Sequence, residues 1–346
     1  MSFFKKFLPL LILGIIVNIS LCADDAKQDT KKAAEPTAKD DDTKKDDKKS
    51  DDDKKDDKKD DDEKKDDEKK DDDSKPKEEI KPPQIGNFSL PSSQQPASHL
   101  GFGFGVIDKG EVEIFCTGND FVGRHKAIVE FTPGILFGVT DSWSLGFAFP
   151  FFTYQKDGHA HSDGLADFFI ESDFTFYSKS TYDYAEGATL VADLFFPTGS
   201  SLKNPTTGFG APAFFLGANY TRTWIDWFVV TGVGGLLTWS EHGTKFGDQF
   251  VYQFAFGNTI PSPCGWIYAW ALQFDGVYSK KNRIDGEIDD NSGGNTFFIT
   301  PTVSISSREF LMQFGVGVPV NQNLFGHQHK FDYSLNLYLQ WSFYQD

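Results

Sequence analysis

Polar side chains recur at alternate positions in segments that are otherwise apolar. Within residues 189–224, Leu190 and Leu194 share one face of a segment with period two, and Asp193 lies on the other face. The same alternation predicts a polar face that lines an interior, made of Asp167, Glu171, Asp173, Asp193, Gln253, Gln273, Asp275, Asp332 and Asn336. Buried carboxylates are costly unless they are paired or wet, so this face is expected to hold water or cations and to favour cations over anions. The alternative is a filled interior in which basic groups neutralise the acids.

The seven histidines avoid the strand centres, and we expect those in predicted loops to be ordinary polar residues. The alternative is a metal site for Zn²⁺ or Cu²⁺, formed if the loops that carry two His-x-His pairs and one further histidine converge. The residues concerned are His159, His161, His242, His327 and His329. No serine stands in a recognisable motif with a strand-borne histidine. The sequence therefore predicts neither an enzyme nor a cofactor.

The segments that carry these residues read as long β-strands. Ordinary strands span about 5 to 6 residues, whereas a tilted strand that crosses a bilayer needs roughly 9 to 11. Most of the candidate strands reach the longer figure: 110–117, 125–139, 143–155, 164–178, 187–198, 210–224, 227–239, 248–260, 265–279, 296–306, 309–320 and 330–344. The sequence predicts an all-β fold, a transmembrane antiparallel up-and-down β-barrel of about 12 strands within residues 100–346. The alternative is a secreted soluble β-protein with an aromatic core.

The connections between the candidate strands alternate between short and long almost throughout. Short periplasmic turns and longer external loops are typical of outer-membrane barrels. Five tryptophans fall near the predicted periplasmic ends, as an interfacial aromatic girdle would: Trp143, Trp224, Trp227, Trp266 and Trp341. We therefore expect an outer-membrane location with membrane lipid as a partner, and an even strand number places both chain ends in the periplasm.

The N-terminal region divides into a targeting segment and a charged tail. Residues 1–23 combine two lysines with an apolar run and are predicted to be a signal peptide, cleaved after Cys22 or Ala23. The alternative is a lipoprotein in which Cys22 is acylated. Residues 24–99 contain a low-complexity Lys/Asp-rich tail, predicted to be disordered, and a proline-containing lead-in. We expect a solvated spacer, and the alternative is a tether or cation-binding brush with periplasmic or cell-wall contact through residues 24–85.

Composition limits the classes of partner. The chain has 346 residues, with 34 Lys plus Arg against 51 Asp plus Glu, and a formal net charge of −17. Nucleic-acid binding requires clustered Lys and Arg, so a nucleic-acid partner is not expected. The three cysteines are too few for a disulfide framework, and their spacing matches no metal motif.

The barrel region resembles a known family of Gram-negative proteins. Residues 164–167 read Gly-Leu-Ala-Asp at the start of a strand, where the family has Gly, an aliphatic residue, Gly and Asp. Residues 197–199 read Pro-Thr-Gly at the end of a strand, a glycine-rich re-entry follows at 208–210, and residues 318–319 read Val-Pro. On these motifs the chain resembles the outer-membrane transporters known as meta-pathway phenol-degradation proteins. The resemblance implies passive uptake of small apolar or aromatic compounds.

These inferences give two hypotheses for function. The first is an outer-membrane channel or transporter for passive uptake of small solutes, with an acidic lumen that favours cations. The second is a plugged structural or surface-interaction barrel whose charged periplasmic tail is the functional part. Ion conductance separates the two hypotheses, because an open channel conducts ions and a plugged barrel does not.

Overall fold

The computed structural model describes residues 81–95, 102–103, 105–241, 243–262 and 265–344. The chain divides into two units, residues 1–79 and 80–346, and the described residues belong to the second unit. The predicted signal peptide and the charged tail up to residue 80 lie outside the described residues. Within the described part of the chain, no helix is long and apolar enough to cross a membrane.

Long β-strands make up most of the described chain. Two short 3-10 helices precede them, η1 (Gly86–Ser89) and η2 (Ser92–Gln94). Fourteen strands form one large sheet: β1 (Val112–Val122), β2 (Lys126–Thr140), β3 (Trp143–Ala148), β4 (Phe151–Asp157), β5 (Ala160–Leu165), β6 (Phe168–Ser180), β7 (Tyr184–Phe196), β8 (Ala213–Trp224), β9 (Trp227–Thr238), β11 (Gln249–Pro261), β12 (Ile267–Ser279), β15 (Gly294–Ser306), β16 (Phe310–Leu324) and β17 (Tyr333–Phe343). A separate three-stranded sheet joins β10 (Thr244–Lys245), β13 (Arg283–Ile284) and β14 (Glu287–Ile288).

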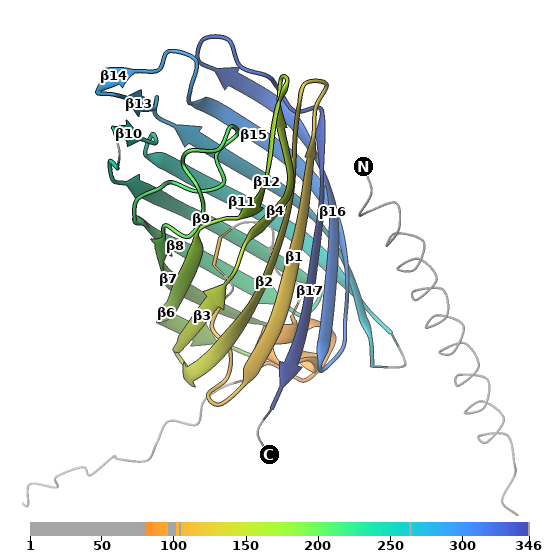
Figure 1. Ribbon diagram of the computed structural model, residues 1–346. Helices are drawn as coiled ribbons and strands as arrows, with labels where there is room; N and C mark the ends of the chain where they lie inside the picture. The colour runs from red at the N-terminus through yellow and green to blue at the C-terminus, as the bar shows by residue number, and fades with distance from the viewer. Residues whose placement is uncertain (1–80, 96–101, 104, 242, 263–264, 345–346) are drawn as a thin grey trace, which may run out of the picture. The chain divides into compact units, whose positions relative to one another are not determined.

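The large sheet closes on itself, and its strands form the wall of a cylinder in Figure 1. Neighbours in sequence are antiparallel neighbours in the wall, and β1 pairs with both β2 and β17. β3 and β4 run along β2 as one interrupted strand, and β5 and β6 make the next one, so the fourteen elements form twelve wall strands. The prediction of an antiparallel up-and-down barrel of about 12 strands is confirmed.

Two wall strands are interrupted where the sequence analysis predicts continuous strands over 143–155 and 164–178. β3 and β4 are separated by residues 149–150, and β5 and β6 by residues 166–167. Pro150 lies in the first gap and has no backbone N–H with which to continue a ladder. The carbonyl oxygen of Pro150 instead accepts a hydrogen bond of 2.9 Å from the Ala166 N–H. The two gaps therefore lie side by side, and the irregularity affects neighbouring strands together.

The two ends of the barrel carry connections of different length. The short-turn end has connections of at most five residues, 141–142, 181–183, 225–226, 262–266 and 307–309. The opposite end, the long-loop end, carries 197–212, 239–248, 280–293 and 325–332, but also tight turns at 123–125 and 158–159. Predicted long loops at 118–124 and 156–163 are wrong, because β1 continues to Val122 and β4 and β5 form a tight hairpin.

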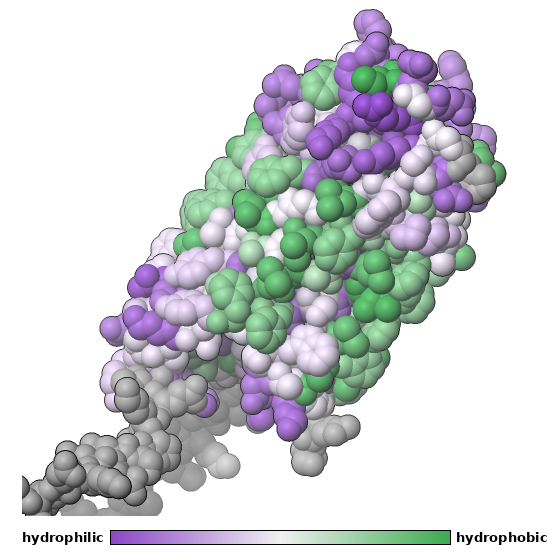
Figure 2. Space-filling model, turned by 90° about the vertical axis from the view of Figure 1, so that its left-hand side faces the viewer, coloured by the Kyte–Doolittle hydropathy of each residue, from purple (hydrophilic) through white to green (hydrophobic). Residues whose placement is uncertain are grey.

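Side-chain alternation gives the barrel an apolar outer face. In β7, Leu190 and Leu194 are exposed, whereas Val191 and Asp193 face inward and are buried. Exposed Trp143 lies at the start of β3, beside a turn of the short-turn end. Figure 2 shows a hydrophobic band across one face of the barrel, with more hydrophilic surfaces toward its ends. Such a band is typical of the lipid-facing surface of outer-membrane barrels.

Inward-facing side chains fill part of the interior. One buried cluster joins four residues from different wall strands, Phe115, Ala148, Leu311 and Tyr338. A second cluster contains Val191, Ala213, Phe215 and Leu236, with Phe102 packed against it. The rings of Phe102 and Phe215 meet edge to face, with 4.8 Å between their centroids. The interior is therefore a partly packed lumen with separate cavities.

Candidate functional site in the barrel lumen

Most of the polar residues predicted to line an interior do face the lumen. Seven of the nine lie on the inner face of wall strands: Glu171 and Asp173 on β6, Asp193 on β7, Gln253 on β11, Gln273 and Asp275 on β12, and Asn336 on β17. Asp167 is buried in the gap between β5 and β6. Asp332 precedes β17 at the long-loop end and is exposed, so it does not line the lumen.

Three of these acids form a buried group on β6 and β7. Glu171 pairs in register with Asp193, and Asp173 faces the same side two residues farther along β6. Oδ2 of Asp173 accepts a hydrogen bond of 2.6 Å from the Gly105 N–H. Oδ1 of Asp173 and Oδ1 of Asp193 are buried and accept no hydrogen bond from any described residue. This part of the lumen is therefore rich in acceptors and suited to positive charge.

Asp167 has a different position from the other acids, because it joins a loop to the wall. Its Oδ1 accepts a hydrogen bond from the Gly199 N–H at 2.9 Å, and its Oδ2 accepts one from the Phe209 N–H at 2.7 Å. Thr198 adds a bond from its hydroxyl to the Ala166 carbonyl oxygen at 2.8 Å. The acid thus holds the loop of residues 197–212 against the interrupted part of the wall. This geometry explains why an acid follows the glycine-containing strand start that the sequence analysis singled out.

A segment that precedes β1 lies inside the barrel, and residues 86–95, 102–103 and 105–111 form this lumen segment. Its first anchor is Asn87, which is fully buried at the short-turn end. The Asn87 Nδ2 group donates to the carbonyl oxygens of Trp224 and Trp227 at 2.9 and 3.3 Å, and its Oδ1 accepts from the Thr259 hydroxyl. The Asn87 N–H donates to the Ile225 carbonyl oxygen at 2.7 Å. Figure 1 shows this part of the chain, in orange, at the lower end of the barrel.

The second anchor lies against β17. Gln340 donates from Nε2 to the Ser93 carbonyl oxygen at 3.0 Å, and Gln94 donates from Nε2 to the Ser342 hydroxyl. Ser93 donates from its hydroxyl to Oε1 of Glu111 at 2.8 Å. These side chains are buried, so their hydrogen bonds are shielded from bulk water.

The third anchor lies deeper in the lumen, on β8 and β11. The Phe102 N–H donates to Oε1 of Gln253 at 3.1 Å, and the Phe102 carbonyl oxygen accepts from Nδ2 of Asn219 at 2.9 Å. Gly103 has a φ of +82°, and a Cβ at this position would lie 2.7 Å from Nδ2 of Asn219 and 2.9 Å from Cγ2 of Val191. The position therefore requires glycine both for its backbone conformation and for its close approach to the wall.

The last part of the lumen segment returns to β1 along β6 and β3. After the contact of Gly105 with Asp173, the Ile107 N–H donates to the Ser144 hydroxyl at 2.9 Å. Ile107 is buried, with 2 % of its surface exposed. Because its anchors lie on β8, β9, β11, β17, β6 and β3, the lumen segment crosses the barrel interior. Residues 86–95, predicted to belong to a proline-containing lead-in, therefore lie in the lumen, and Asn87, Gln94 and Gln340 are lumen residues that the sequence pattern does not predict.

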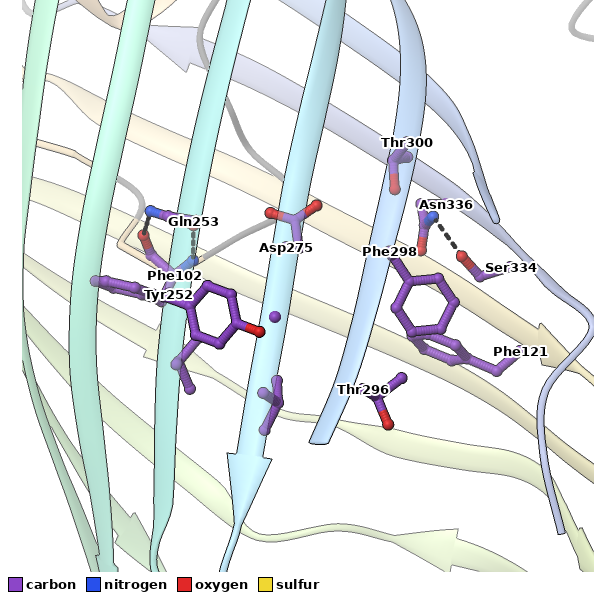
Figure 3. Close-up of a pocket in the computed structure, with 13 residues that line it drawn as sticks. Phe102, Phe121, Tyr252, Gln253, Asp275, Thr296, Phe298, Thr300, Ser334 and Asn336 are labelled. Atoms are coloured by element: carbon purple, nitrogen blue, oxygen red, sulfur yellow. Dashed lines mark hydrogen bonds between the residues drawn. The ribbon is translucent and has the colours of Figure 1, made fainter. Parts of the chain in front are cut away.

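A cavity of about 350 Å³ lies between the lumen segment and the wall strands β11, β12, β15 and β17. Figure 3 shows the side chains around it, which include four aromatic residues, Phe102, Phe121, Tyr252 and Phe298, and six polar ones, Gln253, Asp275, Thr296, Thr300, Ser334 and Asn336. A second space of about 210 Å³ shares Val277 and Thr296 with this cavity and is also lined by Asn282 and Gln328 of the long loops. The cavity therefore leads toward the long-loop end, and Phe102 of the lumen segment forms part of its wall.

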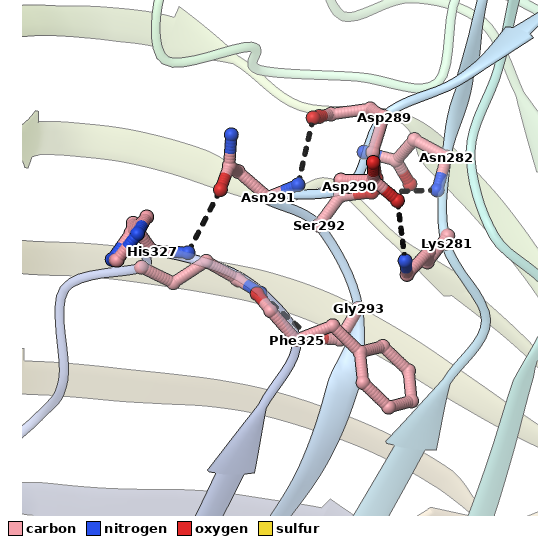
Figure 4. Close-up of polar contacts among 10 residues, drawn as sticks. Lys281, Asn282, Asp289, Asp290, Asn291, Ser292, Gly293, Phe325 and His327 are labelled. Carbon is pink, nitrogen blue, oxygen red and sulfur yellow. Dashed lines mark hydrogen bonds and ion pairs between the residues drawn. The ribbon is translucent and has the colours of Figure 1, made fainter.

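Two long loops are tied together at the end to which the cavity leads, as Figure 4 shows. The His327 N–H donates to Oδ1 of Asn291 at 2.8 Å, and Nε2 of Gln328 donates to the Gly293 carbonyl oxygen at 2.8 Å. Lys281 and Asp290 form an ion pair of 2.6 Å within one of these loops. Exposed ion pairs contribute little to stability, so the backbone contacts define this arrangement more than the charges do.

The predicted loop histidines do not form a metal site in the described part of the barrel. His159, His161, His327 and His329 are exposed, and His242 lies outside the described residues. Nδ1 of His329 lies 2.6 Å from Oδ1 of Asp157, and the His329 ring lies 5.3 Å from the His125 ring. Among the residues that the structure describes, no group of three or more His, Cys, Asp or Glu side chains could hold a metal ion.

Comparisons with known proteins give matches in structure but not in sequence. No protein-family model matches the chain, and no curated protein matches it. An outer membrane channel from Pseudomonas putida F1 is 17% identical, covers 72% of this chain and 99% of its own, and has a TM-score of 0.58. The NanC porin is 9% identical, covers 66% and 98%, and has a TM-score of 0.38. The β domain of the Bordetella autotransporter BrkA is 12% identical, covers 68% and 100%, and has a TM-score of 0.37.

The first of these structures supports a conclusion about fold. Its barrel superimposes over almost its whole length, although its sequence identity to this chain is low. The TM-scores of the other two structures are too low to support an argument. With the closed antiparallel wall and the apolar outer band, this similarity shows that residues 110–344 adopt an outer-membrane β-barrel fold.

Proposed function

We propose that this protein is an outer-membrane channel for the passive diffusion of small solutes, and that its own lumen segment closes it. The observation that carries the proposal is a segment of the chain that is hydrogen-bonded across the lumen, below a cavity that leads to the long loops. Its anchors are separate hydrogen bonds to the wall, each of which contributes about 0.5 to 1.5 kcal/mol net, so each anchor can be weakened singly by substitution. The channel would open when the segment leaves the lumen.

The orientation of the barrel follows from the usual arrangement of outer-membrane barrels, in which short turns face the periplasm. The short-turn end, where β1 begins and β17 ends, would then lie on the periplasmic side together with both chain ends. The signal peptide would direct the chain through the inner membrane, and the charged tail would begin in the periplasm. A periplasmic or cell-wall partner that binds residues 24–85 would then act on the side from which the lumen segment enters.

The lumen is expected to favour cations. Asp173 and Asp193 each hold one buried carboxyl oxygen that has no hydrogen-bond partner among the described residues, and Glu171 shares their face of the wall. A cation near this group would relieve part of the cost of burying the carboxylates. The aromatic residues around the cavity add an apolar surface, which agrees with the apolar or aromatic solutes that the family resemblance implies.

The alternative is a plugged barrel with a structural or surface-interaction role. The same hydrogen bonds support it, because the lumen segment and the two inward-facing clusters together fill part of the lumen, with one cluster nearer the short-turn end and the other nearer the long-loop end. In this case the segment would be a permanent part of the fold, and the tail would be the functional part. The two proposals therefore differ in whether the lumen segment moves.

Single-channel recording separates these two proposals. We would reconstitute the mature full-length protein in a planar bilayer, with its barrel state checked by heat-modifiable migration in gels. The channel proposal predicts discrete current steps and a reversal potential in a KCl gradient that shows cation preference. A folded, inserted protein that stays electrically silent over long recordings and over a range of voltages would favour the plugged barrel.

A further inference from the structure

Asp275 is an acidic side chain that faces the lumen cavity. It lies on the inner face of β12, in register with Gln253 on β11 and with Phe298 on β15. Figure 3 shows it between these two neighbours, projecting toward the cavity. Oδ1 of Asp275 is buried and has no hydrogen-bond partner among the described residues. An unpaired buried acceptor of this kind is costly, so the site is incomplete without a donor.

Two side-chain donors on the neighbouring strand β11 are already committed to other acceptors. Nε2 of Gln253 donates to Oδ1 of Asn219 at 2.7 Å and to the Phe102 carbonyl oxygen at 3.3 Å. The Tyr252 hydroxyl donates to Oδ1 of Asn295 at 3.2 Å. None of the thirteen described residues that line the cavity is Lys, Arg or His. The described lining of the cavity therefore supplies the negative group of an ion pair and no positive one.

The rest of the cavity suits the body of an organic cation rather than a hydrated inorganic ion. Phe121 and Phe298 meet edge to face with 5.9 Å between ring centroids, and Phe102 contributes a further ring. Aromatic faces attract cations that carry little hydration, and they pack well against flat apolar groups. The volume of about 350 Å³ has room for one aromatic ring with a short side chain.

We propose that this cavity binds a small protonated amine with a compact apolar or aromatic body. The ammonium group would donate to Oδ1 of Asp275, with the hydroxyl oxygens of Thr300 and Ser334 as further acceptors that line the same space. The apolar body would lie against Phe121 and Phe298. The inference that this amine is the transported solute rests on the proposed function. Binding of the amine from the long-loop end, however, does not require the lumen segment to move.

Calorimetric titration of the full-length protein in detergent tests the proposal without any measurement of conductance. The probe is benzylammonium at pH 7, and benzyl alcohol serves as a neutral probe of nearly the same shape. The test variant is Asp275→Asn, and the matched control is Asp332→Asn, which removes the same charge from an exposed position outside the cavity. Blank titrations into detergent alone correct for partition of the probes into micelles.

We expect Asp275→Asn to weaken benzylammonium binding at least tenfold and Asp332→Asn to change it less than twofold. Benzyl alcohol should bind the native protein at least tenfold more weakly than benzylammonium. Equal binding of the two probes to the native protein would overturn the proposal, and this comparison needs no variant. Undiminished benzylammonium binding to a heat-modifiable Asp275→Asn barrel would also overturn it. A barrel that binds benzylammonium but never conducts would keep this inference and refute the channel.

Discussion

Asn87→Ala is predicted to make the lumen segment leave the short-turn end more often. The substitution removes three side-chain hydrogen bonds, two to the carbonyl oxygens of Trp224 and Trp227 and one from the Thr259 hydroxyl. When the segment is released, water can replace these bonds, so the relevant quantity is the net contribution of each bond and not its full strength. At about 1 kcal/mol per bond, with less for the long bond to Trp227, the anchored state loses about 2 to 3 kcal/mol.

This loss has a measurable size. Each 1.4 kcal/mol changes an equilibrium about tenfold, so the ratio of released to anchored segments should rise about 30- to 150-fold. If release of residues 86–89 is part of opening, the open probability in single-channel records should rise by a similar factor until it saturates. Single-channel recording in planar bilayers at fixed voltage measures this probability directly.

Ser89→Ala provides the matched control for this prediction. The Ser89 hydroxyl donates to the Gly86 carbonyl oxygen at 2.8 Å, within the segment itself, and does not bond the barrel wall. It changes a side chain two residues from Asn87 but leaves the anchor to β8 and β9 intact. An open probability for Asn87→Ala that equals that of Ser89→Ala would refute the reasoning, provided that both variants form heat-modifiable barrels.

Three further predictions address other contacts. Asp173→Asn replaces the carboxyl acceptor of the Gly105 N–H with an amide, so the open probability should rise and the reversal potential should show weaker cation preference, whereas Asp332→Asn should change neither. Gly103→Ala should raise the open probability more than Gly105→Ala does. Both positions have positive φ, but only a Cβ at Gly103 would lie against the wall, so equal effects of the two substitutions would contradict the predicted clash. Desolvation is the largest influence on Asp248 and raises its pKa, but the hydrogen bond from Lys280 and the other contacts outweigh it and lower the pKa below 3.8. Ionised Asp248 therefore stabilises the loop at pH values above its ordinary pKa, and this stabilisation is lost as the pH falls through the lowered pKa. Lys280→Met should move the loss of stability to higher pH, as measured by hydrogen exchange of residues 245–248.

The sequence alone was sufficient for the barrel, because each strand carries its own signal. Leu190, Leu194 and Asp193 alternate with the period of a strand, and the length of such runs identifies strands that can cross a bilayer. The same alternation identified the inward position of Asp173, Asp193 and Asp275. It failed where the signal is not local, at residues 118–122, where a polar stretch remains a strand because β2 and β17 pair with it on both sides.

The lumen segment could not be predicted in this way. Its short 3-10 helices have no periodic pattern, and its partners are far away in sequence: Asn87 contacts Trp224, and Gln94 contacts Ser342. A proline-containing stretch before the first strand looks the same whether it hangs outside a barrel or folds into it. The partners did carry a faint signal, because Gln340 and Ser342 occupy the polar face of the last strand. That face shows only that polar groups point inward and not which segment they bind.

The central claim is that the barrel is a channel that its own lumen segment closes. The most direct test compares single-channel currents of the mature full-length protein with those of a chain that lacks residues 81–105, both recorded in planar bilayers with a KCl gradient. We expect rare openings for the full-length protein and frequent, cation-selective current steps for the shortened chain. A shortened chain that forms a heat-modifiable, inserted barrel and yet conducts no more than the full-length protein would contradict it.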